Sequence, residues 1–258
     1  MGKKLIIGNW KMNLSIGESS LLLNRLSKLV EVHRDVEVVL APTTLALQPI
    51  ALQVDYRQFK LAAQNFYWRD DGPFTGEVSA NQLRGLVQYA LVGHSERRHI
   101  FGEHDKDIRN KVQAAFRNQI TPVLCVGELA SDRAAGEALD VLHDQLTGGL
   151  ANITSEEAER LVVAYEPVWA VGTGDNALPG DVEKVARAIR SQVRNLFGSS
   201  VAKQMRVLYG GSVTVDNAAS YLNTPGIDGL LLGGISLKSR DFATIINNAH
   251  QETTKGKK

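Results

Sequence analysis

A glutamate at the junction of an extended segment and a loop is the residue of this chain best suited to chemistry. Glu166 follows the apolar run Leu161–Tyr165 and precedes Pro167, which disfavours helical backbone at the glutamate and keeps it extended. The residues that follow, Pro167–Ala177, are small, apolar and glycine-rich, as in a loop that closes over a site. A carboxylate beneath such a lid is suited to take a proton from carbon.

Two further side chains are candidates to assist that carboxylate. His94 directly precedes Ser95, where the sequence predicts a helix start. The partial positive charge of a helix start would lower the imidazole pKa and keep the ring neutral. A core histidine or a metal ligand remains an alternative, although no paired histidine or cysteine spacing accompanies His94. Lys11 follows the apolar run at residues 4–8 and is either a ligand-binding cation or a solvated lysine.

Two glycine pairs also follow apolar runs, at Gly210–Gly211 and Gly233–Gly234. Glycine lets backbone N–H groups approach an anion closely, and the residues up to Ser236 can begin a short helix that favours negative charge. The alternative is that these glycines only permit tight turns. Together, at the ends of two successive strands, they predict a phosphate site.

The elements that must position these residues alternate along the whole chain. Short, nearly continuous apolar runs of the kind found in buried parallel strands are separated by longer segments with helical periodicity. One such unit per about 32 residues matches one strand–helix crossover. The pattern predicts an α/β fold, a closed (β/α)8 barrel of eight parallel strands in a single domain over residues 1–258, with a frayed tail at 252–258. The expected strands are Lys4–Gly8, Val36–Ala41, Lys60–Gln64, Tyr89–Gly93, Thr121–Val126, Arg160–Tyr165, Met205–Tyr209 and Gly229–Gly233.

Three helices carry specific signals. Ser15 and Glu18 form a capping box that opens a helix running toward Val30. Apolar residues spaced three to four apart predict a second helix over Asp105–Asn118 and a third that begins at Pro179. Because the active site of such a barrel lies at the carboxyl ends of the strands, the candidate residues should converge there.

Composition restricts the partners and the compartment. The 258 residues carry a formal net charge of +1, so no broad basic field is available for nucleic acid. The single cysteine, Cys125, lies in an apolar run and is expected to be buried and structural, as suits a reducing compartment. No apolar stretch approaches the length of a membrane span, and no signal peptide pattern is present, which predicts a soluble cytoplasmic protein.

Short segments at or near the predicted strand ends form one ordered set: Gly8–Asn13, Ala63–Asn65, Phe74–Glu77, Gly93–Arg98, Ala164–Ala170, Gly172–Gly174, Tyr209–Val213 and Gly233–Gly234. With these segments in this order, the sequence resembles the triosephosphate isomerase family across essentially its full length. The resemblance implies a TIM barrel that interconverts dihydroxyacetone phosphate and D-glyceraldehyde 3-phosphate through an enediol(ate), an activity of glycolysis and gluconeogenesis, without metal or organic cofactor.

The same resemblance assigns catalytic roles, among them the neutral histidine and closing loop for which this family is itself a reference case. Glu166 would be the base, His94 a neutral electrophile that moves protons between two oxygens, and Lys11 an electrostatic stabiliser. Asn9 would orient the substrate oxygens. Glu96, paired with Lys11, and Ser95 would support them.

It also assigns the ligand-binding residues and the lid. Backbone N–H groups would hold the phosphate at Gly172, Ser212, Gly233 and Gly234. The lid would comprise Pro167, Val168, Trp169, Ala170, Val171, Thr173 and Gly174. Val171 replaces the isoleucine usual in the family. The resemblance implies that this position and Leu231 close over Glu166 and make its surroundings apolar, and the methylene that valine lacks would slightly weaken the desolvation that raises the basicity of Glu166. Further departures from the family pattern are Pro73, Asp175, Leu232 and Ile235.

A long segment, Gln64–Glu77, contains four aromatic residues and lacks a strand or helix pattern. It could pack on its own barrel. The resemblance instead implies a homodimer in which this loop enters the neighbouring subunit and places Thr75 near that subunit's active site. Two other functions remain open: a Schiff-base aldolase that uses Lys11 as the nucleophile, and a non-catalytic scaffold that binds phosphate.

Overall fold

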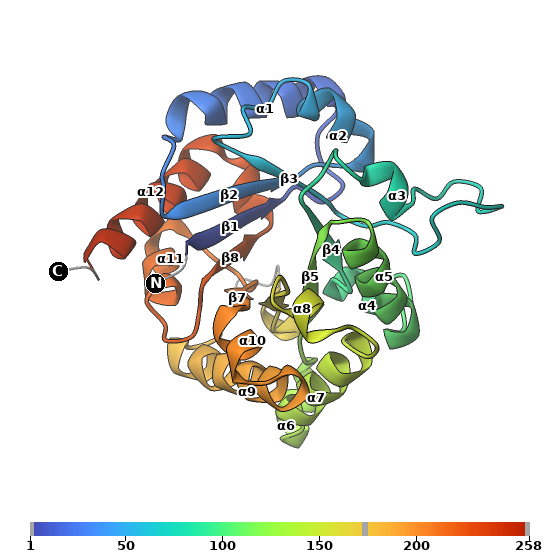
Figure 1. The fold of residues 1–258 in the computed structure, drawn as a ribbon. Coiled ribbons are helices and arrows are strands. Elements are labelled where there is room, and N and C mark those ends of the chain that lie inside the picture. Colours follow the sequence, from blue (N-terminus) through green and yellow to red (C-terminus); the bar gives the residue numbers. More distant parts are fainter. Residues whose placement is uncertain (1–2, 172–174, 256–258) are drawn as a thin grey trace.

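The computed structural model describes residues 3–171 and 175–255, and its centre is a closed barrel of parallel strands (Figure 1). The strands follow one another in sequence order, and the last pairs with the first. The predicted (β/α)8 barrel is therefore confirmed. The strands are β1 (Lys4–Asn9), β2 (Val36–Ala41), β3 (Lys60–Ala63), β4 (Tyr89–Val92), β5 (Thr121–Val126), β6 (Val162–Tyr165), β7 (Arg206–Tyr209) and β8 (Gly229–Leu232).

Helices surround the barrel and cover its outer face (Figure 1). The α-helices are α1 (Ile16–Leu29), α2 (Thr44–Ala51), α3 (Ala80–Leu83), α4 (Ser95–His99), α5 (Asp105–Arg117), α6 (Ala130–Ala135), α7 (Ala138–Gly149), α8 (Ser155–Ala158), α9 (Pro179–Phe197), α10 (Ser199–Gln204), α11 (Val215–Leu222) and α12 (Ser239–Lys255). Two short 3₁₀ helices follow strands, η1 (Val168–Ala170) after β6 and η2 (Gly234–Leu237) after β8.

The predicted local signals have physical counterparts. Ser15 caps α1 in a reciprocal capping box with Glu18, as expected, and α9 begins at Pro179. The predicted start of β6 at Arg160 is two residues early, because the amides of residues 160 and 161 bond to the turn that ends α8. At the carboxyl terminus α12 extends to Lys255, so the chain stays helical beyond the start predicted for the tail at 252–258; residues 256–258 lie outside the described residues.

Alternation along the strands divides the core into two parts. In β1, Leu5 and Ile7 belong to the cluster inside the barrel, whereas Ile6 packs against the surrounding helices. Cys125 is fully buried in the inner cluster, and burial raises the pKa of its thiol. The thiol is therefore a packing group, as predicted.

A polar layer occupies the barrel near the amino-terminal ends of the strands. The hydroxyl of Tyr89 donates to Glu37 Oε1 at 2.6 Å, and Arg206 Nη2 donates to that hydroxyl at 2.7 Å. Arg206 also pairs with Glu37 at 3.3 Å. Burial is the main cause that raises the pKa of Tyr89 to about 12, with a contribution from the charge of Glu37. The layer plugs the end of the barrel opposite to the predicted active site.

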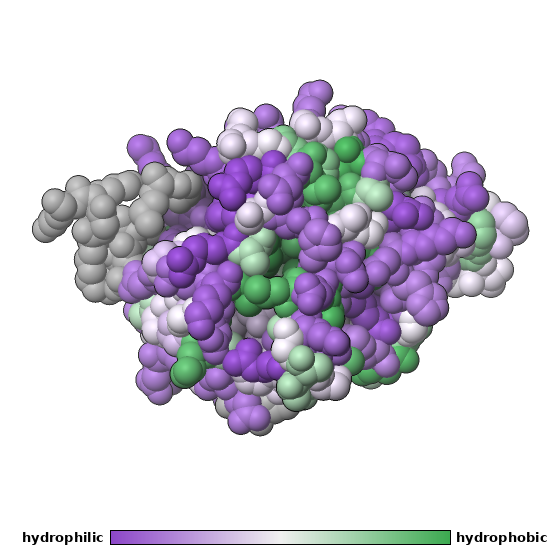
Figure 2. Space-filling model, turned by 90° about the horizontal axis from the view of Figure 1, so that it is seen from below, coloured by the Kyte–Doolittle hydropathy of each residue, from purple (hydrophilic) through white to green (hydrophobic). Residues whose placement is uncertain are grey.

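The surface is mostly polar. On the side of α7 and α9, polar side chains surround a small apolar hollow between these two helices (Figure 2). Within the described ranges, no helix has both the length and the apolar character needed to cross a membrane.

Candidate active site

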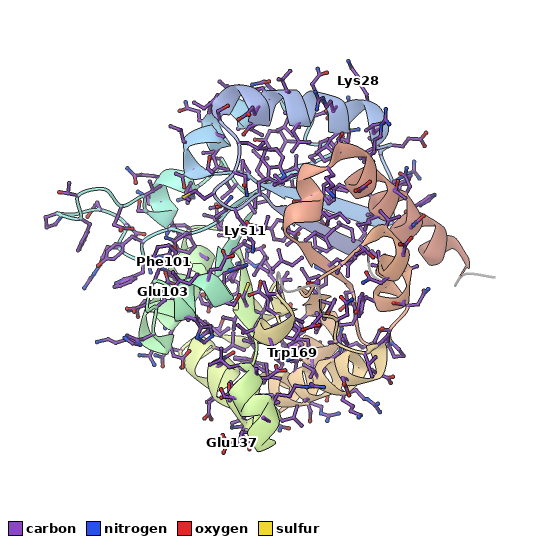
Figure 3. The ribbon with its side chains drawn as sticks, turned by 180° about the vertical axis from the view of Figure 1, so that it is seen from behind. Lys11, Lys28, Phe101, Glu103, Glu137 and Trp169 are labelled. Carbon is purple, nitrogen blue, oxygen red and sulfur yellow. The ribbon has the colours of Figure 1, made fainter. Side chains whose placement is uncertain are left out.

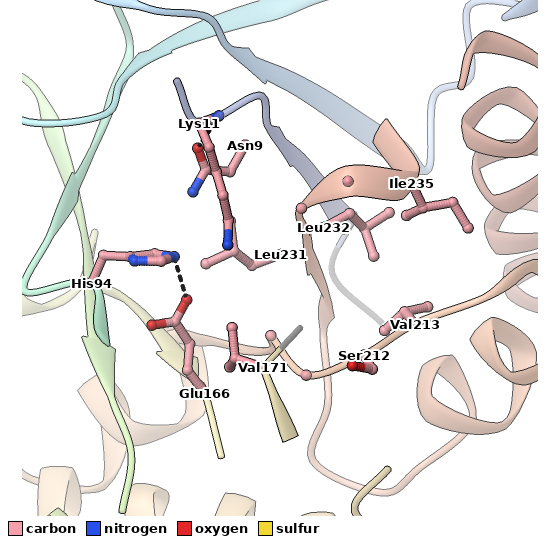
Figure 4. Close-up of a pocket in the computed structure, with 14 residues that line it drawn as sticks. Asn9, Lys11, His94, Glu166, Val171, Ser212, Val213, Leu231, Leu232 and Ile235 are labelled. Atoms are coloured by element: carbon pink, nitrogen blue, oxygen red, sulfur yellow. Dashed lines mark hydrogen bonds and ion pairs between the residues drawn. The ribbon is translucent and has the colours of Figure 1, made fainter. Parts of the chain in front are cut away.

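The predicted site residues converge on one cavity at the carboxyl ends of the strands (Figure 4). Its volume is about 190 Å³. One wall carries the polar side chains expected to do chemistry, and the opposite wall is formed by the glycine-rich turns after β7 and β8. The lining residues are Asn9, Lys11, His94, Glu166, Val171, Gly210, Gly211, Ser212, Val213, Leu231, Leu232, Gly233, Gly234 and Ile235.

The carboxylate and the imidazole face each other directly (Figure 4). His94 Nε2 lies 3.0 Å from Glu166 Oε1, and both side chains are buried. The backbone N–H of Ser95 donates to the other carboxylate oxygen, Glu166 Oε2, at 3.0 Å. The residue predicted as a support, Ser95, therefore acts through its backbone at the start of α4.

The tautomer of His94 follows from its other ring nitrogen. His94 is the N-cap of α4, and the backbone N–H of Glu96 donates to Nδ1 at 3.2 Å. An atom that accepts a hydrogen bond carries no proton, so we infer a neutral ring with its proton on Nε2, donated to Glu166. The helix start thus supplies a specific hydrogen bond to Nδ1, which leaves the ring proton on Nε2.

Both predicted pKa directions are wrong, because a lowered pKa was expected for His94 and a raised one for Glu166. Burial lowers the pKa of His94, but the charge of Glu166 and the hydrogen bond to it raise that pKa more. For Glu166, burial raises the pKa, yet His94, the Ser95 amide and Lys11 lower it below the ordinary value. Sequence reasoning considered the helix end and the apolar walls without the contact between the two side chains.

Lys11 projects into the barrel mouth from the end of β1, unlike Lys28 on the outside of α1 (Figure 3). Its backbone has a φ of 51°, a conformation that costs non-glycine residues of the order of 1–3 kcal/mol. Two contacts hold it: the amide donates to Asn9 Oδ1 at 3.0 Å, and the carbonyl accepts from Gln64 Nε2 at 2.9 Å. Its Nζ lies 2.6 Å from Glu96 Oε1, the pairing predicted from the resemblance.

The glycine-rich wall offers backbone donors. Among the hydrogen bonds found between described residues, none uses the amides of Ser212 or Gly233 as donors. Gly234 begins η2, so its amide has no partner within that helix. N–H groups that have no partner within residues 3–171 and 175–255, beside the mouth that holds Lys11, suit an anionic ligand group.

Comparison with known proteins agrees with this geometry. The sequence profile of triosephosphate isomerase matches residues 4–249. The triosephosphate isomerase of Trichlorobacter lovleyi is 42% identical over 247 residues, which cover 95% of this chain and 98% of that protein. The triosephosphate isomerase of Clostridium acetobutylicum is 43% identical over 248 residues, which cover 96% of this chain and all of that protein.

The chain belongs to the triosephosphate isomerase family. The resemblance seen in the sequence is thereby confirmed, as is the prediction of an enzyme. The fold is the barrel of this family, in one closed ring of eight strands.

In this member of the triosephosphate isomerase family, side chains of the barrel hold the start of the predicted lid. Trp169 Nε1 donates to Glu128 Oε1 at 2.8 Å, and the Arg133 guanidinium lies 4.7 Å from the indole ring centre. The Ser212 hydroxyl donates to the Ala170 carbonyl at 2.6 Å. Of the predicted lid, Pro167, Val168, Trp169, Ala170 and Val171 are described and Val171 lines the cavity; Gly172, Thr173 and Gly174 lie outside the described residues.

Several supporting residues were not predicted. Gln64 fixes the strained backbone of Lys11, and Glu128 holds Trp169. Gln64 lies in a segment shared with the family, so its position at a strand end was a usable signal. Glu128 gave no signal, because only the fold brings it to Trp169. Thr75 is exposed on the protruding loop and does not line the cavity of its own chain.

Proposed function

We propose that this protein interconverts dihydroxyacetone phosphate and D-glyceraldehyde 3-phosphate through an enediol(ate) at the cavity that contains Glu166. One observation carries the proposal. A carboxylate and an imidazole, 3.0 Å apart, face a small cavity whose other wall presents backbone amides that have no partner among the described residues. Acid–base groups at one end and an anion site at the other match a three-carbon sugar phosphate.

Glu166 is the base. The lowered pKa keeps the carboxylate ionised, which is the form that accepts a proton. To reach a substrate carbon, the side chain exchanges its contacts with His94 and the Ser95 amide for the substrate. Burial then dominates, beside Val171 and Leu231, and raises its proton affinity. Glu166 takes the proton from one carbon of the substrate and returns it to the neighbouring carbon.

His94 moves protons between the two substrate oxygens. Its Nε2–H is released when Glu166 moves to the substrate, and it then points into the cavity as a donor. Donating this proton to the carbonyl oxygen neutralises the charge that develops as Glu166 takes the carbon proton. The resulting Nε2 lone pair accepts the hydroxyl proton of the other oxygen, so the ring ends each turnover neutral.

Lys11 and Asn9 stabilise and orient the oxygens. Lys11 is the cation at the mouth, and its strained backbone is fixed by Asn9 and Gln64. A preorganised charge costs no rearrangement when the oxyanion forms, and one such donor contributes about 3–4 kcal/mol in comparable sites. The ion pair with Glu96 favours this electrostatic role over that of a nucleophile.

The phosphate binds to backbone amides of Ser212, Gly233 and Gly234, and Gly172 adds a donor from the lid. Closure of Pro167–Gly174 brings Val171 over Glu166 and excludes water, which strengthens each of these interactions. Loss of phosphate from the intermediate is thereby restrained. The reaction requires no metal or organic cofactor.

The active form is a homodimer. The loop between β3 and α3, residues 64–79, projects away from the barrel (Figure 1) and is preformed: Tyr67 stacks on Trp68 at 4.1 Å and contacts Phe74 at 4.5 Å. Apolar side chains are exposed near the mouth, with Met12 95% and Phe101 67% exposed. A second subunit covers these side chains and receives Thr75 beside its active site.

The compartment follows from the reaction and the chemistry of the chain. We place the protein in the cytoplasm, where glycolysis and gluconeogenesis use this isomerase activity. A buried thiol at Cys125 and the absence of a second cysteine suit a reducing environment.

A coupled assay with each triose phosphate, run in deuterium oxide, tests the proposal. We expect turnover in both directions, uptake of deuterium at carbon, and loss of both in Glu166→Gln. Turnover of neither substrate by a folded protein would support the phosphate-binding scaffold instead. Borohydride trapping of substrate on Lys11 would support the Schiff-base aldolase.

A further inference from the structure

Three side chains with metal-binding chemistry meet at the end of the barrel opposite the cavity. His33 and Asp35 lie in the loop between α1 and β2, and His250 lies near the end of α12. Asp35 directly precedes β2, whose start marks this end of the barrel, and α12 runs beside the starts of β1 and β2 (Figure 1). The isomerase mechanism uses none of the three.

The cluster is compact and ordered by its own contacts. The two imidazole rings stack with centres 4.1 Å apart and planes 16° from parallel. His250 Nδ1 lies 2.7 Å from Asp35 Oδ1. One ligand atom from each of the three residues can be chosen so that all lie within 4.8 Å of one another.

A fourth residue orients one of the rings. His33 Nε2 lies 3.4 Å from the side-chain oxygen of Asn247, one turn before His250 on α12. Because that oxygen only accepts, Nε2 carries the proton and the lone pair of His33 is on Nδ1. A metal-binding histidine usually donates its other ring N–H to an oxygen acceptor, as His33 does here.

We propose that His33, Asp35 and His250 bind one zinc ion, with water as the fourth ligand. Zinc accepts two imidazoles and one carboxylate, whereas magnesium and calcium prefer sites made of oxygen ligands alone. Zinc replaces the proton between His250 and Asp35, and that proton passes to solvent. An imidazole binds zinc through a lone pair in the plane of its ring, so the two nearly parallel rings must leave their stack for both to reach one ion. Two ligands of a tetrahedral zinc lie about 3.4 Å apart, so the Asp35–His250 pair opens as His250 turns, which its partial exposure permits.

The consequence is a clamp between distant parts of the chain. The ion joins the loop before β2 to the last long helix, and so closes the ring of helices where α12 meets α1. It stabilises the fold without touching the cavity. Because binding releases a proton, zinc binds more weakly at pH 5.5 than at pH 7.5.

Titration of tag-free, chelator-treated protein with zinc chloride, in competition with a chromophoric chelator, tests the site. We expect one zinc per chain and a rise in Tm of about 5 °C at a hundredfold excess over Kd. His33→Asn, His250→Asn and Asp35→Asn should each weaken binding at least tenfold. Asn247→Ala should weaken it about tenfold, through the orientation of His33.

His143→Asn is the matched control, because His143 is exposed on α7 and far from the cluster; its zinc affinity should equal that of the unaltered chain. Magnesium chloride should leave Tm unchanged. Since the Tm of each metal-free variant is measured first, a variant that folds poorly is recognised and the other two decide. Unchanged zinc affinity in His33→Asn and His250→Asn overturns the proposal. Zinc occupancy that parallels loss of isomerase activity also overturns it, by locating the ion at His94 and Glu166.

Discussion

Gly210 lies directly against the side chain of Glu166. A Cβ added to Gly210 would come within 2.9 Å of Glu166 Cγ, closer than such contacts occur. The glycine after β7 therefore provides the space in which the carboxylate at the end of β6 sits. This contact gives the turn after β7 a role in placing the proposed base, besides the backbone donors that the turn would offer to a phosphate.

Gly210→Ala should displace the carboxylate by a fraction of an ångström to an ångström. Misplacement on that scale costs about a hundredfold in rate, so we expect kcat to fall by about that factor. The matched control is Gly180→Ala, since a Cβ at Gly180 meets nothing within 4 Å. Steady-state kinetics and circular dichroism of both variants check this. Equal kcat values for the two variants would contradict the positioning role of Gly210.

Glu166→Asp withdraws the carboxylate by one methylene and leaves the glycine-rich wall unchanged. Because the amides of Ser212 and Gly233 and the Lys11 cation remain, KM should change less than threefold. The proton transfer lengthens, and kcat should fall about a hundred- to a thousandfold, within the usual contribution of a positioned base. A near-normal kcat would refute the assignment of the base.

Much of this architecture could be predicted from the sequence, because the residue that follows the carboxyl end of each strand is adjacent to that strand in the chain. The run before Glu166 predicted a strand, and the barrel rule then placed Glu166, His94 and Lys11 at one mouth. The glycine-rich wall was predicted in the same way, from glycine pairs at the ends of two strands. Local patterning was sufficient wherever a residue's role depended on its own element.

The remainder depended on contacts between elements. The pKa directions of His94 and Glu166 were wrong because they depend on a 3.0 Å contact between side chains from β4 and β6. The positive φ of Lys11 is likewise supported from another strand, because Gln64 at the end of β3 donates to the Lys11 carbonyl at the end of β1. No periodic pattern encodes such a contact, so sequence reasoning placed these residues at one cavity but did not give their electrostatics.

Gln64→Ala should relax the strained backbone at Lys11. The variant loses the donors to the carbonyls of Lys11 and Ala41, which lie at 2.9 and 2.8 Å. A net loss of about 1.4 kcal/mol corresponds to a tenfold lower kcat/KM. The exposed Gln53→Ala is the control. If both variants keep full kcat/KM, the strain at Lys11 is maintained by other contacts and the inference is wrong.

Tyr89 should make the fold sensitive to alkaline pH. Its pKa is raised from 10.0 to about 12, so its contribution to stability is complete below pH 10 and is lost as pH rises from 10 to 12. The free energy of unfolding should fall by up to about 3 kcal/mol across that range. Tyr89→Phe should lack this component. Urea unfolding of the unaltered protein and of Tyr89→Phe at several pH values gives the free energy of unfolding of each as a function of pH. Parallel dependences on pH for the two proteins would contradict a raised pKa of Tyr89.

Thr75→Arg should separate the proposed dimer without disturbing the barrel. Thr75 is exposed on the loop between β3 and α3, whose shape is set by the stacked rings of Tyr67 and Trp68. A charged, longer side chain there fits solvent but not the mouth of a second subunit that already contains Lys11. We expect a weaker dimer by sedimentation velocity and a lower kcat that recovers as protein concentration rises. Ser200→Arg is the control and should remain dimeric, because the Ser200 side chain is exposed on α10. A fully active monomer in either variant would show that one chain completes the site alone.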